Sequence, residues 1–309
     1  LGTKTDFLRD APVIEDKVRD AVKEKLNFNV GQSEYLSWRN SLGNAMSHVM
    51  RSDEIPADAG IAIEYRLNGR RFRLDFVISG LDSQGKESLV IIELKQWTEI
   101  QFSDLEEHIR TALGGGIRDV THPSYQVWSY KSHLELYNEY VYENGLVVEA
   151  CAYLHNCKDG EVINSSRYEN ALRLAPVFFH GEHEKLQELV ADKIRKGAGT
   201  SLLERVDQSP IRPSKQLADA VGNMLNGQEE FVLLDEQKTA FETIIRNARQ
   251  VQTSGKKVLI IKGGPGTGKS VISINALAKL TSERLNVKYV TANAAPRDVF
   301  QAKLKGLIK

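Results

Sequence analysis

The sequence is poor in cysteine and has no long hydrophobic run. Its 309 residues include two cysteines, Cys151 and Cys157, whose C-x5-C spacing is not that of a zinc site. So few cysteines suit a reducing compartment. No apolar stretch approaches the roughly 20 residues that a membrane helix needs, and the N-terminus has no signal-peptide core. We therefore expect a cytoplasmic protein without a membrane partner.

A net charge is also missing, but the two ends of the chain differ. The whole sequence has 41 Lys and Arg against 41 Asp and Glu. From Gly227 onward there are 14 basic and 7 acidic residues, which leaves 27 basic and 34 acidic residues before it. The basic C-terminal part suits phosphate ligands. The bulk charge of the acidic part does not favour nucleic-acid binding, so any such contact there must be local. Arg70, Arg71 and Arg73 are candidates for this contact, and a solvated strand edge is the alternative.

Two neighbouring apolar runs carry charged side chains at alternate positions. Residues 71–78 and 89–97 both alternate with the period of a strand. The paired strands present Asp75, Glu93 and Lys95 on one face and apolar side chains on the other. Two carboxylates and an amine at a sheet edge can hold a hard divalent cation beside a phosphate. An ordinary amphipathic hairpin with solvated charges is the alternative.

The surrounding segments alternate between helical and strand patterns. Apolar spacing predicts helices over residues 5–28 and 32–50 and strands over 60–67, 146–154 and 175–179. Ser33 as the N-cap places Glu34 in the first turn of its helix, where it complements the helix dipole or joins the carboxylates as a third metal ligand. Residues 98–119 read as irregular, and Gly114-Gly115-Gly116 within them is a turn or a lid hinge.

Another helix is predicted from Pro123 to about Tyr140, because proline is favoured at the first helical position. Gln126 and Tyr130 are four residues apart, so they lie on one face of this helix. A buried polar pair needs partners. Metal-bound carboxylates or a nucleic-acid backbone would supply these partners. The alternative is that Gln126 and Tyr130 are ordinary side chains of an amphipathic helix.

The second motif is a glycine-rich loop between a predicted strand, residues 257–262, and a predicted helix, residues 271–280. The loop has the pattern G-x-x-x-x-G-K-[ST] and consists of Gly263, Gly264, Pro265, Gly266, Thr267, Gly268, Lys269 and Ser270. Backbone N–H groups of such a loop cradle phosphates. Lys269 would reach the β- and γ-phosphates, and Ser270 would ligate Mg²⁺. Upstream, the amide of Gln237 can read the adenine edge, and residues 287–291 read as the next strand.

The set Asp75, Glu93-Leu94-Lys95 and Gln126-x-x-x-Tyr130 resembles the PD-(D/E)xK nuclease superfamily, in particular its RecB-like branch. The resemblance covers residues 30 to about 195. It implies that Asp75 and Glu93 bind Mg²⁺ or Mn²⁺, and that Lys95 positions or activates the attacking water. Gln126 and Tyr130 would support the site.

Two positions qualify this resemblance. A glutamate on the first helix often joins the metal site in the family, which makes Glu34 a candidate third ligand. Arg73-Leu74 stand before Asp75, where the family pattern has a proline.

From about Ser214 onward the chain resembles superfamily 1 helicases, most closely the Schlafen-type ATPase family DUF2075. Gln237 matches the Q motif, residues 263–270 match motif I, and residues 291–295 match motif Ia. The chain ends at Lys309, before any Walker B carboxylates, arginine finger or second RecA-like domain, and it lacks an initiator Met. Both features fit a trimmed chain or a fragment. We expect ATP binding without appreciable ATP hydrolysis.

The predicted fold class is α/β. A PD-(D/E)xK restriction-endonuclease-like core, with a mixed sheet flanked by helices, occupies residues 1–196. Residues 197–226 form a linker and connecting helix, and residues 227–309 form a truncated RecA-like P-loop domain. The expected function is Mg²⁺-dependent hydrolysis of DNA or RNA, in nucleic-acid processing or anti-phage defence. The alternative is an inactive nuclease fold that serves as a nucleic-acid-binding or nucleotide-sensing switch. An oligomer or a partner protein is left open.

Overall fold

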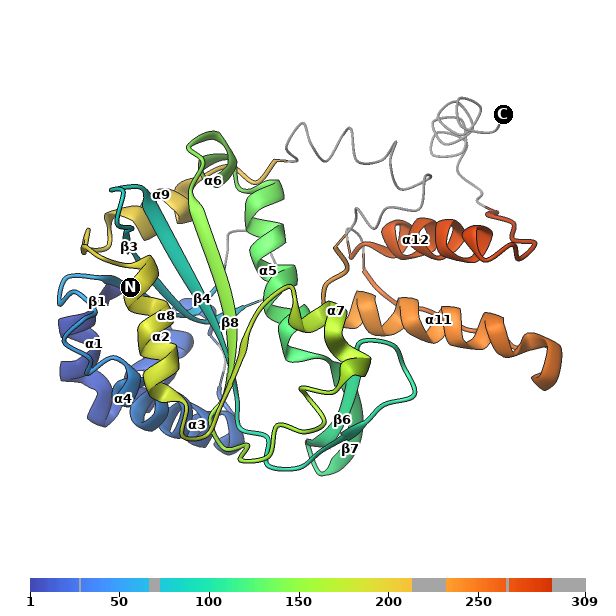
Figure 1. The fold of residues 1–309 in the computed structure, drawn as a ribbon, viewed down its shortest axis with the longest axis horizontal. Helices are drawn as coiled ribbons and strands as arrows, with labels where there is room; N and C mark the ends of the chain where they lie inside the picture. Colours follow the sequence, from blue (N-terminus) through green and yellow to red (C-terminus); the bar gives the residue numbers. More distant parts are fainter. Residues whose placement is uncertain (28, 67–72, 213–231, 265–266, 291–309) are drawn as a thin grey trace.

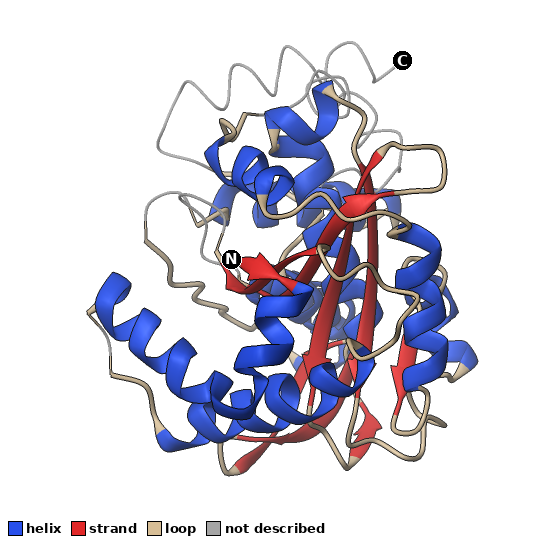
Figure 2. Ribbon diagram, turned by 90° about the vertical axis from the view of Figure 1, so that its left-hand side faces the viewer, coloured by secondary structure: helices blue, strands red, loops and turns tan. Residues whose placement is uncertain are grey.

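A six-stranded mixed sheet forms the centre of the molecule (Figure 2). The computed structural model describes residues 1–27, 29–66, 73–212, 232–264 and 267–290. The strand order is β1-β2-β3-β4-β8-β9, with bounds Gly2–Thr3, Gly60–Tyr65, Leu74–Leu81, Glu87–Lys95, Val147–Leu154 and Val177–Phe179. Strands β1 to β4 pair antiparallel, whereas β8 runs parallel to β4 and β9 parallel to β8. The prediction of an α/β protein with a mixed sheet flanked by helices is confirmed.

The helices before β2 are α1 (Lys4–Asp10), α2 (Ile14–Leu26), α3 (Gln32–Trp38), the π-helix η2 (Arg39–Met46) and α4 (Ser47–Val49). A single helix over residues 5–28 was predicted, but the 3-10 turn η1 (Ala11–Val13) divides it. Pro12 lies in that turn, and proline lacks the N–H that a continuous helix requires.

The later helices are α5 (Pro123–Tyr137), α6 (Glu139–Glu143), η3 (Ser166–Tyr168), α7 (Glu169–Leu172), α8 (His183–Lys193), α9 (Ser201–Gln208), α11 (Asp235–Ser254) and α12 (Lys269–Ser282). Across the residues described, none of the helices is both long and apolar enough to cross a membrane. The predicted helices at 123–140 and 271–280 correspond to α5 and α12.

Both faces of the central sheet are covered by apolar side chains. On one face Val90 and Ile92 join a core with the N-terminal helices, which contribute Trp38 and Met46. On the other face Leu89 and Ile91 join a core with α5 and α9. Strand β4 is therefore buried on both sides, as strands with parallel neighbours usually are. Glu93 lies on the α5 side of β4 and is only 4% exposed, so a solvated hairpin is excluded for this strand.

Part of the predicted linker belongs to the core. Residues 201–208 form α9, whose Leu202, Leu203 and Val206 are buried against the sheet. This stretch was predicted as part of a linker and connecting helix over residues 197–226. The structure has the amphipathic helix α9 directly after the glycines that suggested a break. Residues 213–226, where the connecting helix was expected, lie outside the described residues. So do Arg70, Arg71 and the predicted Asn68-Gly69 turn.

A second, three-stranded sheet occupies the stretch that the sequence indicated as irregular. Its strands are β5 (Ile100–Phe102), β6 (His108–Leu113) and β7 (Gly116–Thr121), all antiparallel. Gly114 and Gly115 connect β6 to β7 with φ of +60° and +80°. Positive φ at both central residues is what a two-residue type I′ hairpin requires. The glycine run is therefore a hairpin turn.

The C-terminal part consists of two packed helices and a loop. Helices α11 and α12 lie side by side, and their core contains Phe241, Ile245, Ile272, Ala276 and Leu280 (Figure 1). The strands predicted over residues 257–262 and 287–291 are wrong for the described positions: neither 257–262 nor 287–290 forms a strand. Val258 is 86% and Ile260 is 78% exposed. A strand is stable only with hydrogen-bonded neighbours, and no described segment pairs with either run.

Candidate functional site

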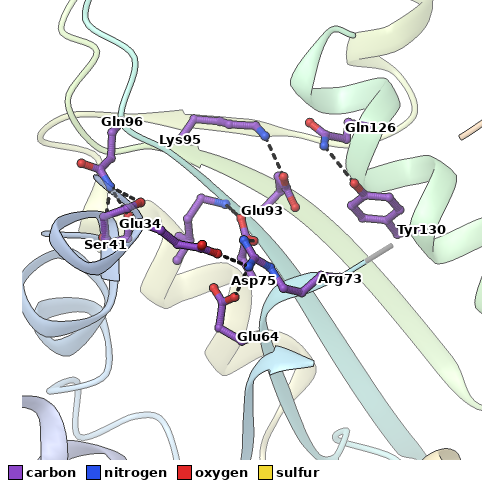
Figure 3. A network of polar contacts seen from close by, with 12 residues as sticks. Glu34, Ser41, Glu64, Arg73, Asp75, Glu93, Lys95, Gln96, Gln126 and Tyr130 are labelled. Carbon is purple, nitrogen blue, oxygen red and sulfur yellow. Dashed lines mark hydrogen bonds and ion pairs between the residues drawn. The ribbon is translucent and has the colours of Figure 1, made fainter. Parts of the chain in front are cut away.

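A cavity of about 1190 Å³ opens where β4 ends. Strands β3 and β4, helices α3 and α5, the β6–β7 hairpin and the start of α11 supply its walls. It is lined by all five predicted catalytic residues and by the candidate third ligand on α3: Asp75, Glu93, Lys95, Gln126, Tyr130 and Glu34. These residues span almost a hundred positions in the sequence, and the fold brings them into one cavity (Figure 3).

The pairing of β3 with β4 places Asp75 beside Glu93. The last paired residues are Phe76 and Ile92, so Asp75 and Glu93 each lie one position beyond the pair. The Asp75 Oδ2 atom accepts a hydrogen bond of 3.0 Å from the backbone N–H of Leu94. This bond fixes the Asp75 carboxylate at the end of the ladder.

Glu93 and Lys95 form an ion pair inside the cavity. The Lys95 Nζ atom donates to Glu93 Oε1 at 2.7 Å, and the ammonium also lies 5.1 Å from the centre of the Trp97 ring. Burial alone would lower the pKa of Lys95, but the carboxylates of Glu93 and Asp75 raise it above the usual value. Lys95 is therefore an ammonium at neutral pH and can stabilise negative charge on a phosphate.

The second carboxylate oxygen of Glu93 differs from the first in its contacts. Glu93 Oε2 is buried and finds no hydrogen-bond partner among the described residues. Burial and then the neighbouring charge of Asp75 raise the pKa of Glu93, against the lowering effect of Lys95. An unpaired buried carboxylate oxygen is costly. A cation or a proton at this position would remove that cost.

Arg73 holds two further carboxylates at the cavity wall. Its Nη1 atom lies 2.8 Å from Glu34 Oε1 and 2.5 Å from Glu64 Oε2, and its Nη2 atom lies 3.9 Å from Asp75 Oδ1. Helix α3 begins at Gln32 with Gly31 as its N-cap, so the predicted Ser33 cap is wrong, although Glu34 still falls in the first turn. Glu34 is thus an ion-pair partner of Arg73 in this structure.

Glu64 was missed by sequence reasoning. It has φ of +52°, which is uncommon for a residue with a side chain, and burial raises its pKa to about 7. The only signal was that Glu64 is the one acidic residue in the apolar strand β2. An isolated acid in such a strand is a candidate for a site rather than for the core.

Acidic side chains outnumber basic ones around the cavity. Eight carboxyl groups line it, against the four cationic side chains of Arg66, Arg73, Lys95 and Arg118. A bound cation would reduce this excess. Yet no three or more His, Cys, Asp or Glu side chains are arranged to hold a metal ion anywhere in the described part of the chain. Asp75, Glu93 and Glu64 lie near the ends of β3, β4 and β2 at the same edge of the sheet.

The Gln126–Tyr130 pair closes the cavity from α5. Gln126 Nε2 donates to the Tyr130 hydroxyl at 2.9 Å, as expected for one helical face. The Tyr130 hydroxyl in turn donates to Asp235 Oδ2 at 2.8 Å. Burial raises the pKa of Tyr130, so it stays a neutral donor. Asp235 comes from α11, and no local pattern in the sequence could have placed it in this cavity.

The glycine-rich loop leads into α12. Gly268 is the N-cap of this helix with φ of +82°, and Ser270 is exposed in its first turn. Lys269 Nζ donates to the carbonyl oxygens of Gly263 and Gly264 at 2.7 and 2.6 Å. The lysine thus lies along the loop, where it can exchange these carbonyls for phosphate oxygens. Gly266 lies outside the described residues.

Gln237 contacts this loop directly. Its Nε2 atom donates to the carbonyl of Thr267 at 3.0 Å, and its Oε1 atom accepts from the N–H of Leu234 at 3.1 Å. Both ends of the amide are therefore bound to backbone groups. Reading an adenine edge, as the sequence indicated, would require Gln237 to exchange these bonds.

Residues 256–308 match the family model of the Schlafen group 3 DNA/RNA helicase domain. This stretch is thus similar to a nucleic-acid-related ATPase module, in agreement with the helicase resemblance of the glycine-rich loop. The match includes none of the residues from Asp75 to Tyr130 that line the cavity. No curated protein and no solved structure matches the chain.

Proposed function

We propose that this protein is a metal-dependent nuclease that hydrolyses phosphodiester bonds of DNA or RNA, joined to an ATP-binding module of helicase type. The observation that carries the proposal is the arrangement around Glu93. A buried carboxylate with one free oxygen lies beside Asp75 and 2.7 Å from the Lys95 ammonium, in a cavity open to a ligand.

The carboxylates fit Mg²⁺ or Mn²⁺ bound by Asp75 and Glu93. Mg²⁺ is commonly held by one or two carboxylates together with waters and substrate phosphates, so a cage of three protein ligands is not required. The buried oxygen of Glu93 and the excess of carboxyl groups around the cavity both favour a divalent cation. Such an ion would supply positive charge that polarises the phosphodiester.

The protein side chains have separate roles in this reaction. The Lys95 ammonium would orient the attacking water and stabilise the charge that develops on the phosphate oxygens. Tyr130 and Gln126 would hold the substrate backbone or the carboxylates from the α5 side. At the other motif, Lys269 and the N–H groups at the start of α12 would bind the phosphates of ATP.

The direct test is cleavage of labelled single- and double-stranded DNA and RNA in Mg²⁺ or Mn²⁺. Glu93→Gln and Asp75→Asn should lower the rate on the order of 10²-fold or more, because each removes a carboxylate that would hold the cation needed to stabilise charge on the phosphate. Lys95→Ala should do the same. Glu87→Gln changes a carboxyl at the opposite end of β4 and is the matched control. Undiminished cleavage by Lys95→Ala would contradict the assignment.

A second candidate is an inactive nuclease fold that binds nucleic acid or senses nucleotide. It is favoured by the internal pairing of the charges, since Arg73 already bridges Glu34 and Glu64, and Lys95 already pairs with Glu93. Calorimetric titration with Mn²⁺ separates the two candidates. Binding that Glu93→Gln abolishes supports the nuclease, whereas no binding supports the switch.

A further inference from the structure

Helix α11 packs along α12 and also contacts β7 of the three-stranded sheet (Figure 1). Toward the sheet part, Lys238 forms an ion pair with Glu107 at 2.5 Å, and Thr239 is hydrogen-bonded to His108 at 2.9 Å. Lys238 also pairs within α11 with Glu242 at 3.0 Å. Toward α12, the helix packs through an apolar face. One helix therefore contacts both parts.

The first turn of α11 enters the carboxylate cavity. Asp235 lines the cavity and accepts from Tyr130, while its second oxygen, Oδ1, is buried and has no hydrogen-bond partner within the described residues. The backbone of Asp235 has φ of +29°. Such a conformation persists in a non-glycine residue only where the surroundings fix it. The cavity contact of Asp235 thus depends on the position of this turn.

The same turn also touches the glycine-rich loop. Gln237, two residues after Asp235, holds the Thr267 carbonyl. A Cβ atom on Gly268 would lie 2.4 Å from Gln237 Nε2, so the amide leaves no free space against the loop backbone. A phosphate in the loop would compete with the carbonyls of Gly263 and Gly264 for Lys269. A rearrangement of the loop backbone on binding would reach Gln237 directly.

We propose that the first turn of α11 couples nucleotide occupancy of the glycine-rich loop to the carboxylate cavity, with Gln237 as the contact on the loop and Asp235 as the positioning residue on Tyr130. The inference rests on the proposed function, because it assigns regulation to that site. Coupling between two binding sites is reciprocal, so a ligand in the cavity and a nucleotide in the loop change each other's affinity by the same factor. Removal of the Tyr130–Asp235 contact should therefore be detectable as a change in nucleotide affinity.

The first experiment measures nucleotide affinity without any cleavage. A fluorescent ADP analogue is titrated against wild type, Tyr130→Phe and Tyr140→Phe. Tyr130→Phe deletes the hydrogen bond to Asp235 and should change the dissociation constant by about fivefold or more. Tyr140→Phe deletes a hydroxyl that bonds Glu87 at 2.7 Å, away from α11, and should leave the constant unchanged. Equal affinities of Tyr130→Phe and wild type overturn the coupling.

The second experiment measures the ratio of cleavage rates with and without saturating ADP, with metal in excess over nucleotide. Wild type should give a ratio that departs from one by about fivefold or more. Asp235→Asn and Gln237→Ala should bring the ratio to one, whereas Glu236→Gln, an exposed carboxyl of the same turn, should keep it. A ratio that Asp235→Asn leaves at the wild-type value overturns the proposal.

The outcomes separate this inference from the function on which it rests. Cleavage that requires Glu93 but does not change with ADP contradicts the coupling and leaves the nuclease assignment intact. If no Glu93-dependent cleavage occurs, the nuclease assignment fails. The nucleotide affinities of the two tyrosine variants then test the coupling without any cleavage measurement.

Discussion

Two apolar runs of the same composition differ in structure: one forms a buried strand and the other is exposed and forms no strand. Residues 89–92 read Leu-Val-Ile-Ile and form the centre of β4, where Ile92 is fully buried. Residues 258–261 read Val-Leu-Ile-Ile and form no strand, and Ile260 is 78% exposed. The difference lies in the neighbours: β4 is hydrogen-bonded to β3 on one side and β8 on the other. Strand propensity selects which residues can pair, but only a partner makes the strand.

The comparison is tested most strongly by the same substitution in both runs. Ile92→Ala should lower the free energy of unfolding by about 4 kcal/mol, because it leaves a cavity in a packed core. Ile260→Ala should change it by less than about 0.5 kcal/mol, since the side chain is in solvent. Urea unfolding measures both. A large loss for Ile260→Ala would show that the second run is buried in solution.

The contact between the two parts gives the next largest effect. Lys238→Met should destabilise by about 3 kcal/mol, because it leaves Glu107 and Glu242 without their buried cation. Hydrogen exchange of the α11 amides would report the loss locally. Lys279→Met is the matched control on α12, where the lysine side chain is 39% exposed, and no measurable loss is expected. Equal exchange in both variants would show that the buried ion pair does not hold α11.

The free energy of unfolding should depend on pH because of the carboxyl groups in the cavity. The pKa of Glu64 is raised from 4.5 to about 7 on folding. A carboxyl with a raised pKa contributes stability that is complete below the unfolded value and lost as the pH rises through the folded value. Between pH 4.5 and 8 this loss amounts to about 2 kcal/mol once partial exposure is allowed for.

Glu64→Gln removes this titration. The variant should therefore gain stability relative to wild type as the pH rises from 5 to 8, in urea unfolding at each pH. A difference between the two proteins that does not change with pH would exclude a raised pKa for Glu64.

The smallest effect concerns the hairpin that the sequence did not predict. Gly115→Ala should cost about 1 kcal/mol, because φ of +80° is strained for a residue with a Cβ although the space around it is open. Gly116→Ala has the same open space without a positive φ and should be neutral. Thermal unfolding of the two variants checks this, and equal melting temperatures would argue against the type I′ turn.

Periodicity predicted the two strands and the helix that carry the motif residues, because the pattern of each lies within its own segment. Alternation located the strands that carry Asp75 and Glu93, and helical spacing placed Gln126 beside Tyr130. Asp235 and Glu64 were not predicted, because they reach the cavity through tertiary contacts that no spacing encodes. The chemical role of the motif residues remains a prediction.

In the C-terminal part the helix α12 was predicted and the strand before it was not formed. Helical hydrogen bonds close within the segment, whereas strand hydrogen bonds require a second segment. The same reason explains the missed β5–β7 sheet. Helix α9 was missed for a different reason, because Gly197 and Gly199 before it indicated a break in regular structure.

The exposed run of residues 258–261 is bounded by lysines, with Lys256 and Lys257 before it and Lys262 after it. Charges that flank an apolar strand-forming segment oppose its stacking on identical segments of other molecules. This protection is electrostatic, and it weakens as salt shortens the screening length from about 10 Å at 0.1 M to about 3 Å at 1 M. Concentrated solutions should therefore remain clear at low ionic strength and become turbid as salt is added.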